Sequence, residues 1–248
     1  DCGRVLHLGS DACAVETSAP SRDAPVGIVP WADGQWHMGA FNMKEPSERR
    51  RRGPDLWLEA AYDLLAQHGH GAVTIEQLTA QTAKTRGSFY HHFGSMEAFV
   101  ERLMVDWRER NTERIVRLTE GTSEPNARRS LVNQEALRLD ARLEIALRIW
   151  AGVHAHVRAA CDDVDRRRVS VMAHDLADLA KALGCDLSEP KARTLAQIEY
   201  AAFVGAQLLA PEGKSTALTE LGQVYDDMLT AYLTHLRAVS GAPLRHSV

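Results

Sequence analysis

The chain of 248 residues has long stretches without proline, from Asp55 to Glu124 and from Asn126 to Glu189. Proline removes a backbone donor and clashes with the preceding helical turn, so its absence permits long helices. These stretches are rich in alanine, leucine, arginine and glutamate, and they show almost no alternating strand pattern. The sequence therefore predicts an all-α fold of about nine helices.

Several other features are missing. No apolar run approaches the roughly 18 residues that suggest a membrane span, and no basic start with an apolar core indicates secretion. We therefore expect a soluble cytoplasmic protein without a membrane partner. No hydrolase, zinc-protease, phosphate-loop or dinucleotide motif occurs, so we expect no catalytic residue and no cofactor.

Cysteine is scarce and scattered, at Cys2, Cys13, Cys161 and Cys185. No two of these residues form a C-x-x-C pair, and none has a histidine at zinc-finger spacing. We expect reduced thiols and no metal site.

Positive charge is not in excess either, because the net charge is −4. The distribution of charge says more than its sum. The one dense basic run, Arg49 to Arg52, directly precedes the first expected helix. Such a run is commonly just solvated, but at this place it favours contact with phosphates or a minor groove, for which Arg51 and Arg52 are candidates.

Residues 1–46 differ from the rest because they contain four prolines and many small polar residues without a sustained period. We expect a disordered or loosely attached extension there. One hypothesis is that the natural start is Met38 or Met43 and that the upstream residues are an addition.

Two short helices, residues 74–81 and 85–92, follow a first helix over residues 55–68. Thr74 and Gln77 form a T-x-x-Q capping box, and residues 82–83 make a tight break. This spacing is typical of a helix-turn-helix, whose second helix enters the major groove with its N-terminal end at the bases. Arg86 is the sharpest candidate, because its fork can address two guanine acceptors. Phe89 and Phe93 are expected to pack inward.

The same region resembles the tetracycline-repressor (TetR) family. The matching segments are V-T-I-E-Q-L-T, T-R-G-S-F-Y-H-H-F and G-S-M-E-A-F, and the resemblance is specific over about residues 54–105. It implies a DNA-binding head at residues 47–95 and a helical body at residues 96–240 that binds a ligand and dimerises. It also implies base contacts for Thr85, Arg86, Gly87 and Ser88, with phosphate contacts for Thr74, Tyr90 and His92. His91 is added as a polar aromatic at the same end of the helix.

The sequence departs from the family pattern at two points. Ala83 and Lys84 stand where many members have glycine and an apolar residue, and Met96 stands where lysine is frequent. The first departure predicts a slightly different turn or a DNA-facing Lys84. The second predicts one phosphate contact fewer.

Beyond the head, Ser95 is expected to cap a fourth helix that runs to about Thr119. Five more helices are expected in the body. Their approximate ranges are residues 142–151, 154–162, 165–183, 188–209 and 216–236.

The last two helices look like a homodimer interface. Small residues at 201, 202, 205 and 206 allow close approach of two backbones, and the residues that supply apolar surface are Tyr200, Phe203, Val204 and Leu208. An ordinary helix pair within one subunit is the alternative. A mostly apolar effector cavity is expected in the body. Its candidate lining residues are Trp150, His154, Met172, Tyr200, Phe203 and Gln207, although residues of these types in such positions are more often ordinary core than ligand contacts.

The resulting hypothesis is a transcription regulator that binds operator DNA and is released by an unidentified small molecule. Three alternatives stay open: an enzyme, a DNA-binding protein controlled by a protein partner, and a family member that has lost DNA binding.

Overall fold

The computed structural model describes residues 53–209 and 215–240, with the side chains of all of these except 215–218 and 240. The expected extension at residues 1–46 and the predicted contacts of Arg51 and Arg52 lie outside the described residues. Within the described ranges the chain is helical and contains no strand, which confirms the predicted all-α class. No helix in these ranges is long and apolar enough to cross a membrane.

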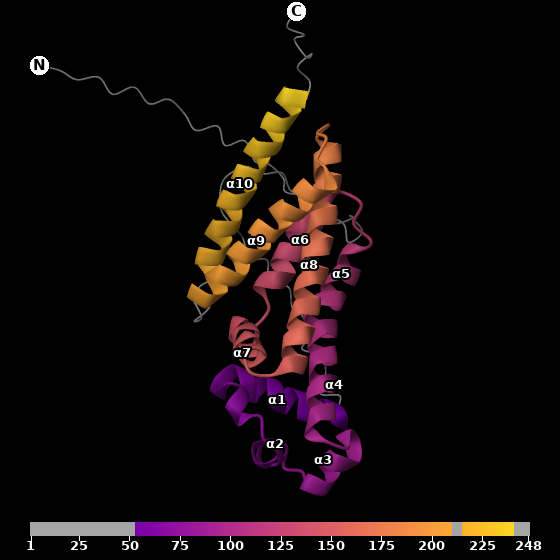
Figure 1. Ribbon diagram of the computed structural model, residues 1–248, viewed down its shortest axis with the longest axis vertical. Helices are drawn as coiled ribbons and strands as arrows, with labels where there is room; N and C mark the ends of the chain where they lie inside the picture. The colour runs from indigo at the N-terminus through magenta and orange to yellow at the C-terminus, as the bar shows by residue number, and fades with distance from the viewer. Residues whose placement is uncertain (1–52, 210–214, 241–248) are drawn as a thin grey trace, which may run out of the picture. The chain divides into compact units, whose positions relative to one another are not determined.

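Three helices form the head (Figure 1): α1 (Pro54–His68), α2 (Ile75–Thr82) and α3 (Arg86–Phe93). Pro54 occupies the start of α1, where a missing N–H is no loss. The helix ends before Gly69, whose φ of 75° and ψ of −178° belong to a region that is essentially restricted to glycine. One 3-10 turn, His70–Ala72, then leads toward α2.

Side-chain caps set the helix starts that the sequence predicted. Thr74, Thr85 and Ser95 each accept a hydrogen bond from the backbone N–H three residues later, at 3.3, 3.2 and 3.1 Å. These bonds satisfy donors that have no partner inside the helix. The reciprocal half of the capping box is replaced, because the Thr74 N–H donates to the Ala72 carbonyl at 2.8 Å.

The expected fourth helix is continuous from Met96 to Thr119, but it is not uniform. It comprises α4 (Met96–Arg108), a π-helical turn (Glu109–Glu113) and α5 (Arg114–Thr119). If this rod is taken as one helix, the described chain has nine, as predicted. π turns inside α-helices are rare and are frequent at functional sites.

Five helices make the body: α6 (Pro125–Leu137), α7 (Ala141–Ala151), α8 (Ala155–Ala182), α9 (Glu189–Leu209) and α10 (Ser215–Ser240). The long helix α8 runs through the middle and contacts α4, α6, α7 and α9 (Figure 1). Two details of the prediction were wrong. There is no break between residues 162 and 165 in α8, and α6 was not among the expected helices.

The predicted break in α8 was wrong because Val157, Cys161 and Val164 continue one buried stripe along the helix. The omission of α6 has a different reason, which is polar burial. Helix α6 has no apolar stripe, and its buried residues are Arg129 and Glu135. Ion pairs hold it in place, and their partners lie far away in the sequence.

Two hydrophobic clusters form the core. The first contains Trp57 and Phe89 of the head, Trp107 of α4, and Leu147 and Val164 of the body. The second joins the C-terminal half of α8 to α9 and α10. The expected boundary between residues 95 and 96 falls inside the first cluster, so the head and the lower body share one core.

Candidate nucleic-acid interface

Helix α3 packs on the head through Phe89, which is fully buried, and through the half-buried Phe93. The Phe89 ring centroid lies 5.3 Å from that of Trp57 and 5.2 Å from those of Phe93 and Phe99, in edge or tilted arrangements. Aromatic pairs at such distances add to the stabilisation that burial provides. This contact fixes which face of α3 points outward.

The residues predicted to read bases lie together at the N-terminal end of α3. Thr85, Arg86 and Gly87 are exposed, and Ser88 is half-buried. A Cβ atom added at Gly87 would meet only the Thr85 hydroxyl, at 3.8 Å. The fold itself therefore does not require glycine at position 87, which is consistent with a requirement from a surface that approaches α3 from outside.

Arg86 has a partner that sequence reasoning missed. Its Nη2 atom lies 2.7 Å from Oε1 of Glu76 on α2, and both side chains are mostly exposed. The contact forms because the turn brings α2 and α3 together at an angle. No local spacing rule could have found it, since the residues are ten apart. The pair aligns the guanidinium, and its remaining N–H groups stay available to an outside acceptor.

The predicted phosphate-binding residues lie at the start of α2 and in the C-terminal half of α3. Tyr90, His91 and His92 are exposed, with Tyr90 at 44%. Thr74 is half-buried and uses its hydroxyl as the cap of α2. Lys84 is exposed in the turn between the helices.

The departure at Ala83 has a structural consequence. Its φ of 52° and ψ of 35° lie in the left-handed region, and it is the only described non-glycine residue with positive φ. That conformation disfavours a side chain, which explains why glycine is frequent at this place in the family that the sequence resembles. The turn therefore bears the strain of the Ala83 methyl group.

The π turn connects the head to the long helix. Arg110 in the turn binds Glu59 of α1 and, at 2.7 Å, Asp106 of α4. Tyr62 of α1 donates a hydrogen bond of 2.8 Å to the same Asp106 carboxylate. Burial and the Asp106 carboxylate raise the pKa of the Tyr62 hydroxyl, so it remains a neutral donor.

The opposite side of the π turn is held by the body. Arg168 of α8 donates to the Thr112 hydroxyl at 3.0 Å and to the Asn111 carbonyl at 3.3 Å. The same guanidinium donates to Glu144 of α7 at 3.0 Å and to the Tyr200 hydroxyl at 3.1 Å. Arg168 therefore joins the π turn to the centre of the body.

That centre is a polar cluster, which we define as Glu144, Arg148, Asp165, Arg168 and Tyr200; Glu144 and Tyr200 are buried and the other three are half-buried. Burial disfavours the charged form of Arg168, but Glu144 and Tyr200 outweigh this effect and raise its pKa. Burial similarly raises the pKa of Asp165, and the hydrogen bonds from Arg148 and Tyr200 reverse that and leave it lowered. The cluster thus holds two cations against two carboxylates.

The six predicted lining residues lie in several different environments of the described structure. Trp150 stacks on His70 of the head at 6.2 Å and meets His154 edge-on at 5.5 Å, so this pair lies where α7 meets the head. Tyr200 belongs to the polar cluster, which also removes it from the expected dimer interface because it is buried within its own subunit. Met172 packs against the second core cluster. Gln207 is buried and Phe203 is half-buried on α9.

Comparison with known proteins supports the resemblance. Residues 58–103 match the family model of bacterial regulatory proteins, tetR family. No curated protein matches the chain.

Solved structures share the fold at low sequence identity. A transcriptional regulator from Rhodococcus sp. Rha1 is 16% identical with a TM-score of 0.61, and the match covers 75% of this chain and 98% of that one. A TetR transcription regulator from Haloarcula marismortui is 18% identical with a TM-score of 0.61, and the match covers 72% of this chain and 96% of that one. The reduced form of E. coli NemR is 22% identical with a TM-score of 0.59, and the match covers 69% of this chain and 95% of that one.

The family model thus covers the head with its helix-turn-helix, and the described body has the fold of these regulators. Residues 58–103 are thus similar to the tetR family of bacterial regulatory proteins, and the described helices share the fold of the solved regulators.

Proposed function

We propose that the chain is a homodimeric repressor that binds operator DNA in the cytoplasm and is released by a small-molecule effector. The observation that carries this proposal is the outward face of α3, which Phe89 fixes so that Thr85, Arg86 and Gly87 are exposed together. In a helix-turn-helix that end of the second helix meets the base edges.

Reading and anchoring are assigned to different residues. Arg86 reads a guanine with its two-pronged guanidinium, while Thr85 and Ser88 add shorter polar contacts. Thr74, Tyr90, His91 and His92 anchor the head on phosphates, together with Arg51 and Arg52. Phosphate contacts carry no sequence information, so the two groups have separable effects.

A second copy covers the outer face of α9 and α10. Large apolar side chains there are at least half exposed, among them Ile198, Leu208, Val224 and Met228. An exposed apolar surface spread over two helices is typical of an interaction site. A dimer also doubles the DNA contacts and selects half-sites about 34–36 Å apart.

Effector release uses the contacts around the π turn. Arg168 ties the polar cluster to Thr112 and Asn111, and Arg110 ties the same turn to Glu59 of the head. A molecule that rearranges the cluster therefore changes the support of the head. Operator affinity falls if the effector prefers the arrangement in which the two heads are wrongly spaced.

Footprinting and gel-shift titration on DNA flanking the gene test the DNA-binding part. Arg86→Ala should lose about 1–3 kcal/mol of discrimination at one base pair, because a bidentate contact disappears. Replacing Arg51 and Arg52 should weaken binding to all sequences alike and flatten its salt dependence. Arg166→Ala in α8 is the control, since it removes the same charge from an exposed ion pair in the body.

Other results would contradict the proposal. If footprinting finds no protected site with the wild type, the proposal of DNA binding is wrong. If the Arg86 variant and the Arg51/Arg52 variant behave alike, the division into a base-reading residue and phosphate-binding residues is wrong. Sedimentation of Met228→Glu should give monomers, with exposed Val105→Glu on α4 as the control. If no compound of a broad metabolite panel changes the operator affinity, the proposal of release by a small-molecule effector is wrong.

A further inference from the structure

Asp165 is held in the way that a protein holds a bound carboxylate. Arg148 donates from Nη1 to Oδ2 at 3.1 Å and from Nη2 to Oδ1 at 2.9 Å, and the Tyr200 hydroxyl donates to Oδ1 at 2.6 Å. A two-pronged arginine with an added hydroxyl is a complete carboxylate-binding arrangement. Here the chain fills it with one of its own side chains.

The two carboxylates of the polar cluster are not equivalent. The Glu144 side chain is 5% exposed and accepts from both Arg148 and Arg168, at 2.9 and 3.0 Å. The Asp165 side chain is 32% exposed, so it lies at the edge of the cluster that faces solvent. Asp165 can therefore leave for water while Glu144 stays and still balances part of the positive charge.

The cluster also has an unused donor, and a second unused donor lies beside it. Among the described residues, Arg148 Nε and Trp107 Nε1 are buried and have no hydrogen-bond partner. Trp107 lies against the cluster, with the Arg168 guanidinium 5.7 Å from its ring centroid. Buried donors without an acceptor are rare in native proteins. A polar group that entered this site would find these two donors without a partner among the described residues.

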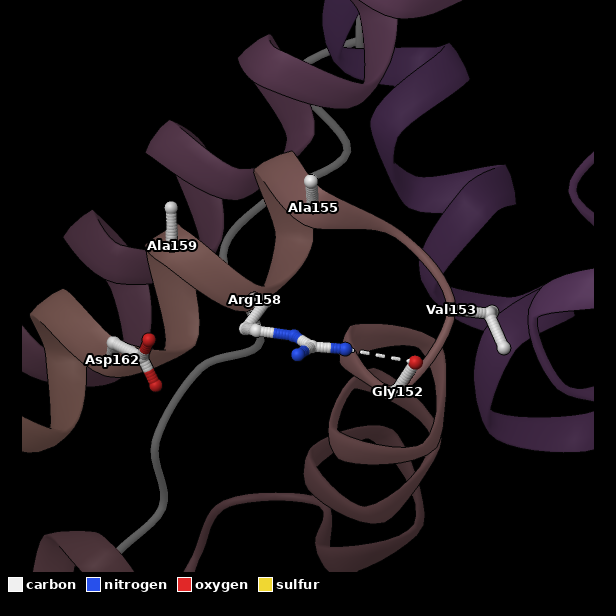
Figure 2. Close-up of a pocket in the computed structure, with 6 residues that line it drawn as sticks. All are labelled: Gly152, Val153, Ala155, Arg158, Ala159 and Asp162. Atoms are coloured by element: carbon white, nitrogen blue, oxygen red, sulfur yellow. Dashed lines mark hydrogen bonds between the residues drawn. The ribbon is translucent and has the colours of Figure 1, made fainter.

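A hollow of about 410 Å³ lies between the end of α7 and the start of α8 (Figure 2). Its lining residues are Gly152, Val153, Ala155, Arg158, Ala159 and Asp162. Asp162 precedes Asp165 by three residues on α8, and Gly152 follows Arg148 by four at the end of α7. The hollow is therefore about one helical turn, or ~5.4 Å, from the Arg148–Asp165 pair along both helices.

The hollow suits the rest of an acid. Val153 and the alanines offer apolar surface, and the Arg158 guanidinium crosses it to reach the Gly152 carbonyl at 2.9 Å (Figure 2). A cation at this place attracts an anion toward Arg148. Asp162 opposes that attraction at the rim, so the preferred molecule has one negative group and a small uncharged remainder.

We propose that the effector is a small carboxylic acid whose carboxylate displaces Asp165 from Arg148 and Tyr200, with its uncharged part in the hollow beside Arg158. The inference rests on the proposed effector control and names the effector's class. Displacement of Asp165 moves Tyr200, which shares Arg168 with the π turn, so the response reaches the support of the head.

The test is rescue of Asp165→Ala, which leaves the carboxylate site vacant. Thermal unfolding is followed with acetate and benzoate, against acetamide and benzamide, at constant ionic strength set with chloride. The two acids should stabilise the variant saturably and the amides should not. Benzoate should bind the variant about tenfold or more tightly than the wild type, because Asp165 competes in the wild type and lowers the fraction of open sites. Asp163→Ala, which breaks an exposed ion pair on the same helix, should show no rescue.

Wild-type protein keeps the test decisive if Asp165→Ala does not fold. Benzoate should then stabilise the wild type and benzamide should not. Equal effects of acid and amide, or no saturable effect of either acid on the wild type, overturn the carboxylate site, even if the variant alone is rescued.

Gel shifts with the same compounds separate this inference from the proposed function. If acids bind but operator affinity is unchanged, the carboxylate site stands and effector release is wrong. If only neutral compounds release the operator and no acid binds, effector release stands and the carboxylate site is wrong.

Discussion

Phe89 and Tyr90 are neighbours on α3 with opposite environments, and they make a stringent test of the interface. Phe89 has no exposed surface and contacts three aromatic rings at centroid distances of 5.2–5.3 Å, whereas Tyr90 is 44% exposed. Truncating a fully buried phenylalanine to alanine removes its transfer free energy and leaves a cavity. Phe89→Ala should therefore lower the free energy of unfolding by about 3–5 kcal/mol.

Tyr90→Ala should behave differently. It removes an exposed side chain and one edge contact with Phe89 at 5.6 Å, so the free energy of unfolding should fall by about 1 kcal/mol or less. Operator affinity should nevertheless fall, by roughly 0.5–1.5 kcal/mol for one lost hydrogen bond to a phosphate. Tyr90→Phe keeps the ring and should lose the same affinity without any loss of stability.

Urea unfolding by circular dichroism gives the stability of each variant, and gel-shift titration gives its operator affinity. The inward and outward assignment of α3 is wrong if Tyr90→Ala destabilises the protein as much as Phe89→Ala does. It is equally wrong if Phe89→Ala leaves the unfolding curve unchanged, because a fully buried side chain cannot be lost without effect.

Three further predictions use other parts of the molecule. Ala83→Gly should raise the free energy of unfolding by about 0.5–1 kcal/mol, because glycine relieves the left-handed strain at φ 52°; a destabilised variant in urea unfolding would contradict this turn geometry. Burial raises the pKa of Asp165, but Arg148 and Tyr200 outweigh burial and lower it. Ionised Asp165 therefore stabilises the fold above its unfolded pKa of about 3.9, and this stabilisation is lost as the pH falls through the pKa of the folded state. The difference in unfolding free energy between wild type and Asp165→Asn should thus be largest near neutral pH and shrink in acid, and a difference that is constant with pH would refute the ion pair. Arg129 on α6 binds Glu199 on α9 through two contacts of 3.1 Å. Arg129→Met should therefore lower the free energy of unfolding by about 3–5 kcal/mol, and the double variant Arg129→Met with Glu199→Gln should lower it much less. A loss below about 1 kcal/mol for Arg129→Met would show that the pair contributes no more than an exposed ion pair does.

The sequence alone was sufficient where the determinants of structure are local. The caps at Thr74, Thr85 and Ser95 act within three residues, so the start of each helix could be read directly. The inward face of α3 followed in the same way, since the 3.6-residue period puts Phe89 and Phe93 on one face and Tyr90 on another.

Sequence reasoning failed where burial is polar. Charged side chains such as Arg129 and Asp165 are usually exposed, so the pattern of apolar residues did not mark α6, whose buried residues are Arg129 and Glu135. Their partners are distant, at 70 residues for Arg129 with Glu199 and 17 for Asp165 with Arg148. Only packing of the helices shows that these charges are paired and therefore stable inside the body.

The all-α class, the helix-turn-helix and the outward face of its second helix were thus determined by the sequence itself, through periodicity, caps and proline. The tertiary structure alone decided that Glu76 holds Arg86, that a π turn sits between Arg110 and Arg168, and that a carboxylate-binding arrangement is filled by Asp165. The physical reason is the range of the interactions: helix formation depends on neighbours three or four residues away, whereas these contacts depend on the angles at which whole helices pack.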